Sequence, residues 1–166
     1  MSDQQWYPAG DSDLGAGGWT KSLDGSPVTP YGSPTAVWWK RLVAIMIDNG
    51  LLYLVTMLVS LQASSSSTVN NLRLVSELIL SFCYFGYLNG VMGQTVGKRV
   101  MGIRCVDAGT GDAIGFRRGL ARHGVVALLS LAFFVPAFID GLWPLWDLKR
   151  QSWHDKAVRS VVINAR

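Results

Sequence analysis

The chain has 166 residues, of which 49% are hydrophobic and 16% are charged, and its mean hydropathy is +0.26. Soluble domains average about 25% charged residues, so this composition argues against an ordinary soluble domain and favours a membrane protein. The formal net charge is +4, but the basic residues flank apolar segments, so the expected partners are the lipid bilayer and its anionic headgroups, with no nucleic acid.

The first 36 residues are rich in Gly, Pro and Ser and show no helical or strand periodicity. This composition predicts a disordered tail over residues 1–36, followed by a membrane domain over residues 37–166. The aromatic residues of the tail, such as Trp19 and Tyr31, are interpreted as scattered side chains. The N-terminus lacks the apolar stretch of a signal peptide, so we expect it to stay in the cytoplasm while internal spans drive insertion.

Two apolar stretches, residues 38–61 and 72–92, predict transmembrane helices. At about 1.5 Å per residue, each is long enough to cross a hydrocarbon core about 30 Å thick. Trp38 and Trp39 suit the membrane interface, and the basic residues that follow them suit its cytoplasmic edge.

The loop over residues 93–123 carries six basic residues. Its "GIRCVD" stretch alternates like a short strand, "AIGF" could return as a second strand, and "FRRGLARH" resembles the amphipathic start of a helix. "MGQTVGKR" is not a phosphate-binding P-loop, because Met92 and Arg99 stand where that motif needs Gly and Ser or Thr. Contact with lipid headgroups is the preferred role for its cations, namely Lys98, Arg99 and Arg104.

A third apolar segment, residues 124–146, is interrupted by Pro136, Asp140 and Pro144. It either crosses the membrane once with a kink or folds back as a re-entrant hairpin. The basic loop before it and the basic C-terminal tail after it both favour the cytoplasm, and only the hairpin places both there. The strand-like "SVVI" over residues 160–163 is predicted to pair with "IRCV" of the loop.

The predicted fold is therefore an all-α membrane protein with a disordered N-terminal tail. It has two clear transmembrane helices and, after them, a third apolar helical segment that is broken or re-entrant. The paired strand-like stretches form a small cytoplasmic β-like cap. The two cysteines, Cys83 and Cys105, fall in different environments and are expected to be unpaired.

Three motifs in order, Arg41 with "AIMIDN", then "GQTVGKRVMGIRCVD", then "KRQSWHDKAVRSVVI", resemble those of the RDD family of small membrane proteins. The resemblance covers residues 38–163, although Ser160 stands where the family usually has Thr. The second aspartate of the family matches Asp140 or Asp155, and the neighbours of Asp155 match better. The resemblance implies a multi-span membrane protein without a settled activity; some members are proposed to exchange cations for protons.

Arg41 and Asp48 lie seven residues apart on one helix face, about 10.5 Å apart along the axis. Side chains lean toward the helix N-terminus, so we expect Arg41 to reach lipid phosphates rather than to pair with Asp48. A carboxylate inside the membrane costs about 2.5–3.5 kcal/mol, so Asp48 needs a protein partner. The candidate partners are Asn89, Arg122 and His123. Asp48 is either a structural clasp between helices or a proton or cation relay.

No nucleophile with its base, cofactor fingerprint or metal-ligand spacing is visible, so we expect a non-enzymatic protein without a cofactor or metal. His154 and Asp155 are interpreted as groups that cap or hydrogen-bond a local turn. The leading hypothesis is an accessory or scaffold protein of the plasma membrane that associates with other membrane proteins or with itself. The alternative is a small oligomeric transporter or cation/proton exchanger, in which Arg41, Asp48 and Asp155 are the intramembrane polar residues.

Overall fold

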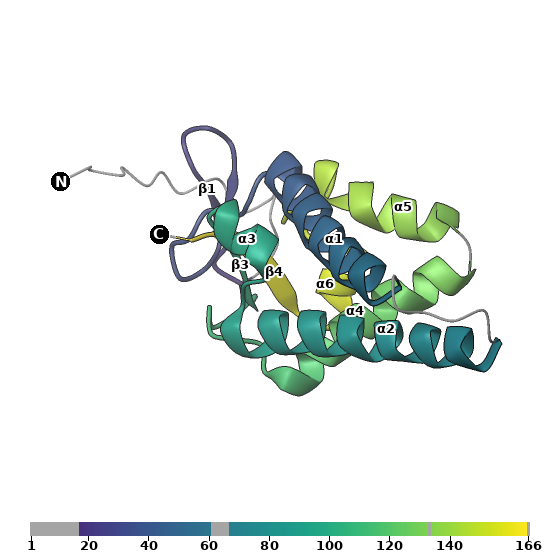
Figure 1. Ribbon diagram of the computed structural model, residues 1–166. Helices are drawn as coiled ribbons and strands as arrows, with labels where there is room; N and C mark the ends of the chain where they lie inside the picture. The colour runs from purple at the N-terminus through teal and green to yellow at the C-terminus, as the bar shows by residue number, and fades with distance from the viewer. Residues whose placement is uncertain (1–16, 61–66, 133, 166) are drawn as a thin grey trace.

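The computed structural model describes residues 17–60, 67–132 and 134–165 (Figure 1). The described chain is mainly helical and has four short strands. The elements, in chain order, are β1 (Thr20–Lys21), β2 (Pro27–Val28), α1 (Trp38–Ser60), α2 (Ser67–Tyr87), the π-helical turn η1 (Leu88–Met92), α3 (Val96–Val100), β3 (Ile103–Asp107), α4 (Phe116–Ala132), α5 (Phe134–Leu142), the 3-10 turn η2 (Trp143–Leu145), α6 (Trp153–Ala157) and β4 (Ser160–Asn164).

Two helices are long and apolar enough to cross a membrane, as the sequence predicts. Residues 38–58 of α1 have a mean hydropathy of 1.6, and residues 67–92, which cover α2 and η1, have 1.3. Many of their large apolar side chains are exposed, which is the surface that lipid would cover. α2 begins at Ser67 rather than at the predicted position 72. Within it, Arg73 and Glu77 pair one turn apart, with Nε and Oε1 2.8 Å from each other.

Glycines let α2 and α4 pack closely. A Cβ atom on Gly119 of α4 would lie 2.3 Å from the carbonyl oxygen of Gly86 on α2, well inside van der Waals contact. Small residues at such a crossing let two backbones approach within a membrane. This contact fixes the start of α4 against the end of α2.

The third apolar segment folds back on itself as α4 and α5 (Figure 1). Arg122, near the start of α4, and Asp140, near the end of α5, both bond to α6. The chain therefore reverses direction between these two helices, which agrees with the hairpin and not with a straight crossing. Pro136 lies in the first turn of α5, where its missing N–H breaks no helical bond.

β3 and β4 form an antiparallel pair in which Arg104 lies opposite Ile163 and Asp107 opposite Ser160. The predicted pairing of "IRCV" with "SVVI" is therefore confirmed. The side chains buried around this pair include Ile103, Cys105, Val106, Val161 and Val162. The predicted second strand in "AIGF" is wrong, because its Gly115 takes a positive φ of 83° and α4 begins at the next residue.

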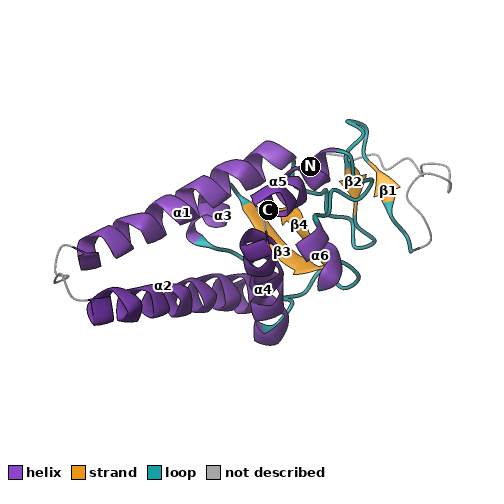
Figure 2. Cartoon of the chain, turned by 90° about the vertical axis from the view of Figure 1, so that its right-hand side faces the viewer, coloured by secondary structure: helices purple, strands orange, loops and turns teal. Residues whose placement is uncertain are grey.

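The predicted disordered tail is wrong for residues 17–36; residues 1–16 lie outside the described chain. β1 and β2 form an antiparallel hairpin, and the amide of Ala36 donates to the carbonyl of Val162 in β4 at 2.9 Å. Both strand pairs lie at one end of the long helices (Figure 2). The glycines here permit turns with positive φ, such as Gly25 and Gly32, so a composition typical of disorder instead supports a hairpin.

Candidate functional site

The carboxylate of Asp155 joins three helices and a strand. Its Oδ2 lies 2.9 Å from Nη1 of Arg41 in α1, and its Oδ1 lies 2.6 Å from Nη2 of Arg122 in α4. Ser160 of β4 also donates its hydroxyl to Oδ1 at 3.2 Å. Burial alone would raise the pKa of Asp155, but the charges of Arg122 and Arg41 and the hydrogen bond from Arg122 hold it well below its usual value. Asp155 is therefore a buried anion shared by two arginines.

The first turn of α6 sets the position of Asp155. Ser152 is the N-cap, and its amide donates to Oδ2 of Asp155 at 3.3 Å in a capping box. This box holds the carboxylate at the helix N-terminus, where the helix dipole also favours an anion. The expectation that "HD" caps a local turn is confirmed for Asp155, which has the additional task of bridging Arg41 and Arg122.

His154 connects the same cluster to α5. Its backbone amide donates to Oδ1 of Asp140 at 3.1 Å, and its Nδ1 bonds to Oδ2 of the same carboxylate. Nε2 of the ring lies 2.9 Å from Nη2 of Arg122, which can only donate, so Nε2 accepts and Nδ1 carries the proton. Burial, and then the charge of Arg122, lowers the pKa of His154, which is consistent with a neutral ring. Asp140, the other candidate for the second aspartate of the motif, thus lies beside Asp155.

Asp48 lies in a separate polar site between α1, α2 and α3. Its Oδ1 accepts from the hydroxyl of Tyr84 at 2.8 Å and from the amide of Gly97 at 2.7 Å, and its Oδ2 accepts from the hydroxyl of Thr95 at 2.5 Å. The side chain is 1% exposed. The residues after η1 fold back into the helices and present three fixed donors to this one carboxylate.

The partners of Arg41 and Asp48 differ from the sequence-based expectations. Arg41 does not extend to lipid phosphates: it is 8% exposed and pairs with Asp155, because β4 and α6 return to the start of α1. The donors to Asp48 are Tyr84, Thr95 and Gly97, not Asn89, Arg122 or His123. The expectation that Arg41 and Asp48 do not pair with each other is confirmed, since each has other partners.

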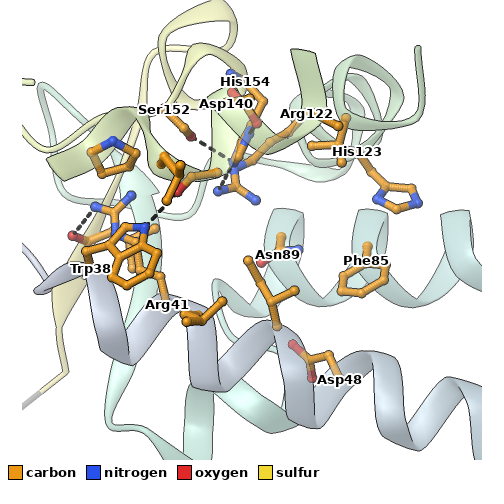
Figure 3. Close-up of a pocket in the computed structure, with 18 of the residues that line it drawn as sticks. Trp38, Arg41, Asp48, Phe85, Asn89, Arg122, His123, Asp140, Ser152 and His154 are labelled. Carbon is orange, nitrogen blue, oxygen red and sulfur yellow. Dashed lines mark hydrogen bonds and ion pairs between the residues drawn. The ribbon is translucent and has the colours of Figure 1, made fainter. Parts of the chain in front are cut away.

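A cavity of about 360 Å³ lies between these two sites (Figure 3). Arg41, Asp48 and Asp140 line it, together with Arg122 and the neutral Asn89. Its remaining walls are mainly apolar side chains of α1, α2, α4 and α5. The volume lies near the lower end of the range for small-molecule pockets, about 300–1,000 Å³.

Lys98 also lines this cavity, contrary to the expectation of headgroup contact. It is 7% exposed, and its ammonium donates to Oδ1 of Asn89. Burial, followed by the charge of Arg122, lowers the pKa of Lys98 to about 8. Thr95 caps α3 and turns this face inward, whereas the neighbouring Arg99 is exposed. Arg104 is half-buried in β3, so headgroup contact stays a prediction for Arg99 and Arg104.

Comparison with known protein families shows which of them the chain matches. The profile of the RDD family matches residues 35–159, which is most of the sequence and contains Arg41, Asp48 and Asp155. The chain belongs to the RDD family. The resemblance to this family that the three sequence motifs indicated is thereby confirmed.

Curated relatives of this RDD protein are mycobacterial. It is 37% identical over 82 residues to a "Proline-rich antigen homolog" of Mycobacterium tuberculosis, and 38% identical over 82 residues to the "Proline-rich antigen" of Mycobacterium leprae. These matches cover 48% of this chain but only 31% and 30% of the relatives, so the chain spans about a third of their length. No solved structure matches this RDD protein.

The residues that the resemblance singles out, Arg41, Asp48 and Asp155, thus fall into two sites, and Arg41 and Asp48 line one cavity. Arg41 and Asp155 bind each other, while Asp48 binds neutral donors. Sequence reasoning missed the pairing of Arg122 with Asp155, for which the only signal was a basic residue at the start of an apolar segment. Among residues 17–60, 67–132 and 134–165, no group of three His, Cys, Asp or Glu side chains could hold a metal ion.

Proposed function

We propose that this RDD protein is a non-enzymatic accessory or scaffold protein of the plasma membrane. The observation that carries the proposal is the hydrogen bonding of its buried carboxylates. Both oxygens of Asp48 and both of Asp155 accept from donors that are fixed in the fold. Such saturated groups tie helices together, so Asp48 acts as a structural clasp and the domain is a rigid platform for other membrane proteins or for a second copy.

The topology that we propose places the N-terminus, the strand pairs and the C-terminal residues in the cytoplasm. The basic loop 93–123 and the basic tail both favour that side. The pairing of β3 with β4 requires the loop and the tail to lie on one side, which supports α4 and α5 as a re-entrant hairpin. Exposed basic residues such as Arg99 and Arg117 would then face anionic headgroups.

The partner surface is proposed to be the outward face of the two long helices. Met46 on α1 is 65% exposed, and Leu74 on α2 is 59% exposed. A photoreactive side chain at Met46 should give one discrete crosslinked product in native membranes, whereas crosslinking to lipid alone would argue against a scaffold.

One observation favours the alternative function, exchange of cations for protons. Asp48 lines the same cavity as Lys98, a buried amine whose pKa is lowered by burial to about 8. An exchanger would pass protons between such groups, with oligomerisation completing the pathway because each chain has few spans.

Ion flux separates the two functions. The full chain is reconstituted in liposomes that contain a pH-sensitive dye, and Na⁺ or K⁺ gradients are applied. The scaffold predicts no change in internal pH beyond that of empty liposomes. Flux that is lost in Asp48→Asn but retained in Asp112→Asn, which alters an exposed carboxylate, would overturn the scaffold and establish exchange.

A further inference from the structure

The polar end of the cavity has hydrogen-bond donors without acceptors. Arg122 uses Nε and Nη2 for Asp155 and His154, and its Nη1 makes no bond to the described residues. Lys98 has three N–H groups and makes one bond, to Oδ1 of Asn89. The Nδ2 amide of Asn89 likewise makes no bond within the described chain. These three side chains converge on the cavity from α4, α3 and η1.

The acceptors around this end are already occupied. Both oxygens of Asp155 are taken by arginines, and both oxygens of Asp140 by His154. The oxygens of Asp48 accept from three other donors. The surplus N–H groups face the cavity, so an acceptor that enters it from outside the described chain can pair with them. Because two of the donor groups are cationic, an anion suits them better than a neutral group.

The rest of the cavity is apolar and opens at the surface of the helices. Leu42 and Ile45 of α1 and Phe138 of α5 line it and are 40%, 46% and 69% exposed. The mouth therefore opens among the side chains that lipid would cover. Figure 3 shows Arg122 and Asn89 on facing sides of the cavity, with Asp48 beyond Arg41 along α1.

We propose that this cavity binds one anionic amphiphile, a phosphate or carboxylate group that carries an acyl chain. The anionic group lies between Asn89, Lys98 and Arg122, and the chain lies along Leu42, Ile45 and Phe138 toward the lipid. The site is independent of the accessory role proposed above, since a scaffold and an exchanger could each hold such a molecule. An anion there also offsets the positive charges that lower the pKa of Lys98.

The test uses the full chain in a neutral detergent, with dodecyl phosphate as the amphiphile and inorganic phosphate as the free anion. Calorimetric titration gives the affinity, and native mass spectrometry gives the stoichiometry. Asn89→Asp replaces an amide donor with a carboxylate that can pair with Lys98, so it removes the anion site while keeping the side-chain shape. Lys98→Met removes the ammonium directly. Arg99→Met is the matched control, because it removes the neighbouring exposed charge from the same helix.

We expect one dodecyl phosphate per chain, with much weaker binding of inorganic phosphate. Asn89→Asp and Lys98→Met should each weaken binding about tenfold or more, since a hydrogen bond to a charged group is lost, while Arg99→Met should leave it nearly unchanged. Thermal unfolding checks that each variant is folded, and either folded variant suffices for the comparison.

Two results would overturn the proposal. Equal binding of dodecyl phosphate by the wild type, Asn89→Asp and Lys98→Met would show that the amphiphile binds elsewhere. Absence of one-to-one binding would show that the cavity does not bind an amphiphile. If inorganic phosphate binds as tightly as dodecyl phosphate, with the same sensitivity to Asn89→Asp, the anion site stands and the acyl chain is excluded from it.

Discussion

Replacing Asp155 with Asn should destabilise the domain more than any change at an exposed ion pair. The carboxylate is fully buried and lies 2.9 Å from Arg41 and 2.6 Å from Arg122, whose side chains are 9% and 11% exposed. Removing one member of a buried pair costs about 3–5 kcal/mol, because the remaining charge stays buried without its partner. Asp155→Asn leaves two arginines in that state, so we expect a loss toward the upper end of this range.

The free energy of unfolding can be measured by titrating micelles of a neutral detergent with sodium dodecyl sulfate and following tryptophan fluorescence. Glu77→Gln is the control, since it breaks a half-exposed pair with Arg73 and should cost no more than about 0.5 kcal/mol. If the free energy of unfolding of Asp155→Asn lies within about 1 kcal/mol of the wild-type value, the arginines bind water or lipid phosphate instead. The description of a closed buried network would then be wrong.

The contribution of Asp155 to stability has a defined pH dependence. The pKa of Asp155 is lower in the folded state than in the unfolded state, so its contribution to stability is fully present above the unfolded value of about 3.9. That contribution is lost only as the pH falls toward the folded pKa. The difference in stability between the wild type and Asp155→Asn should therefore stay constant from about pH 6 to about pH 8, where the carboxyl group is ionised in both the folded and the unfolded state. It should narrow only below about pH 4.

Three further changes test the packing and the second polar site by the same titration. Gly97→Ala places a Cβ atom 2.1 Å from a carbonyl oxygen of α1 and should cost about 1–3 kcal/mol, whereas Gly141→Ala meets nothing within 4 Å and should be tolerated. Tyr84→Phe removes one of the three donors to Asp48 and should cost about 1–2 kcal/mol; no loss would show that the clasp is unimportant. The pKa of Lys98 is lowered to about 8 in the folded chain, so the unfolded chain binds the proton of this amine more tightly. The stability of the wild type relative to Lys98→Met should therefore rise between about pH 8 and about pH 10. A stability difference that does not change with pH would refute the burial of this amine.

Local patterns in the sequence were sufficient for the elements whose periodicity is strong. The apolar runs that begin at Trp38 and before Leu72 form the two long helices, and the alternating "IRCV" and "SVVI" form paired strands. The charge pattern favoured a reversal within the third apolar segment over a single kinked crossing, because basic residues precede and follow it. Residues 17–36 escaped prediction because Gly and Pro are typical both of disorder and of the turns in a short hairpin.

The partners of the buried charges could not be predicted from local patterns. Arg41 and Asp155 are 114 positions apart, and Arg122 and Asp155 are 33 positions apart. Spacing along one helix showed only that Arg41 and Asp48 would not meet. The sequence by itself determined that a membrane domain holds an arginine and an aspartate on one face of its first helix, because apolar length and helical periodicity are local properties. Only the tertiary structure decided that Arg41 is buried against Asp155 and that Asp48 binds Tyr84, Thr95 and Gly97, because those contacts require α6, β4 and the turn before α3 to fold back onto α1.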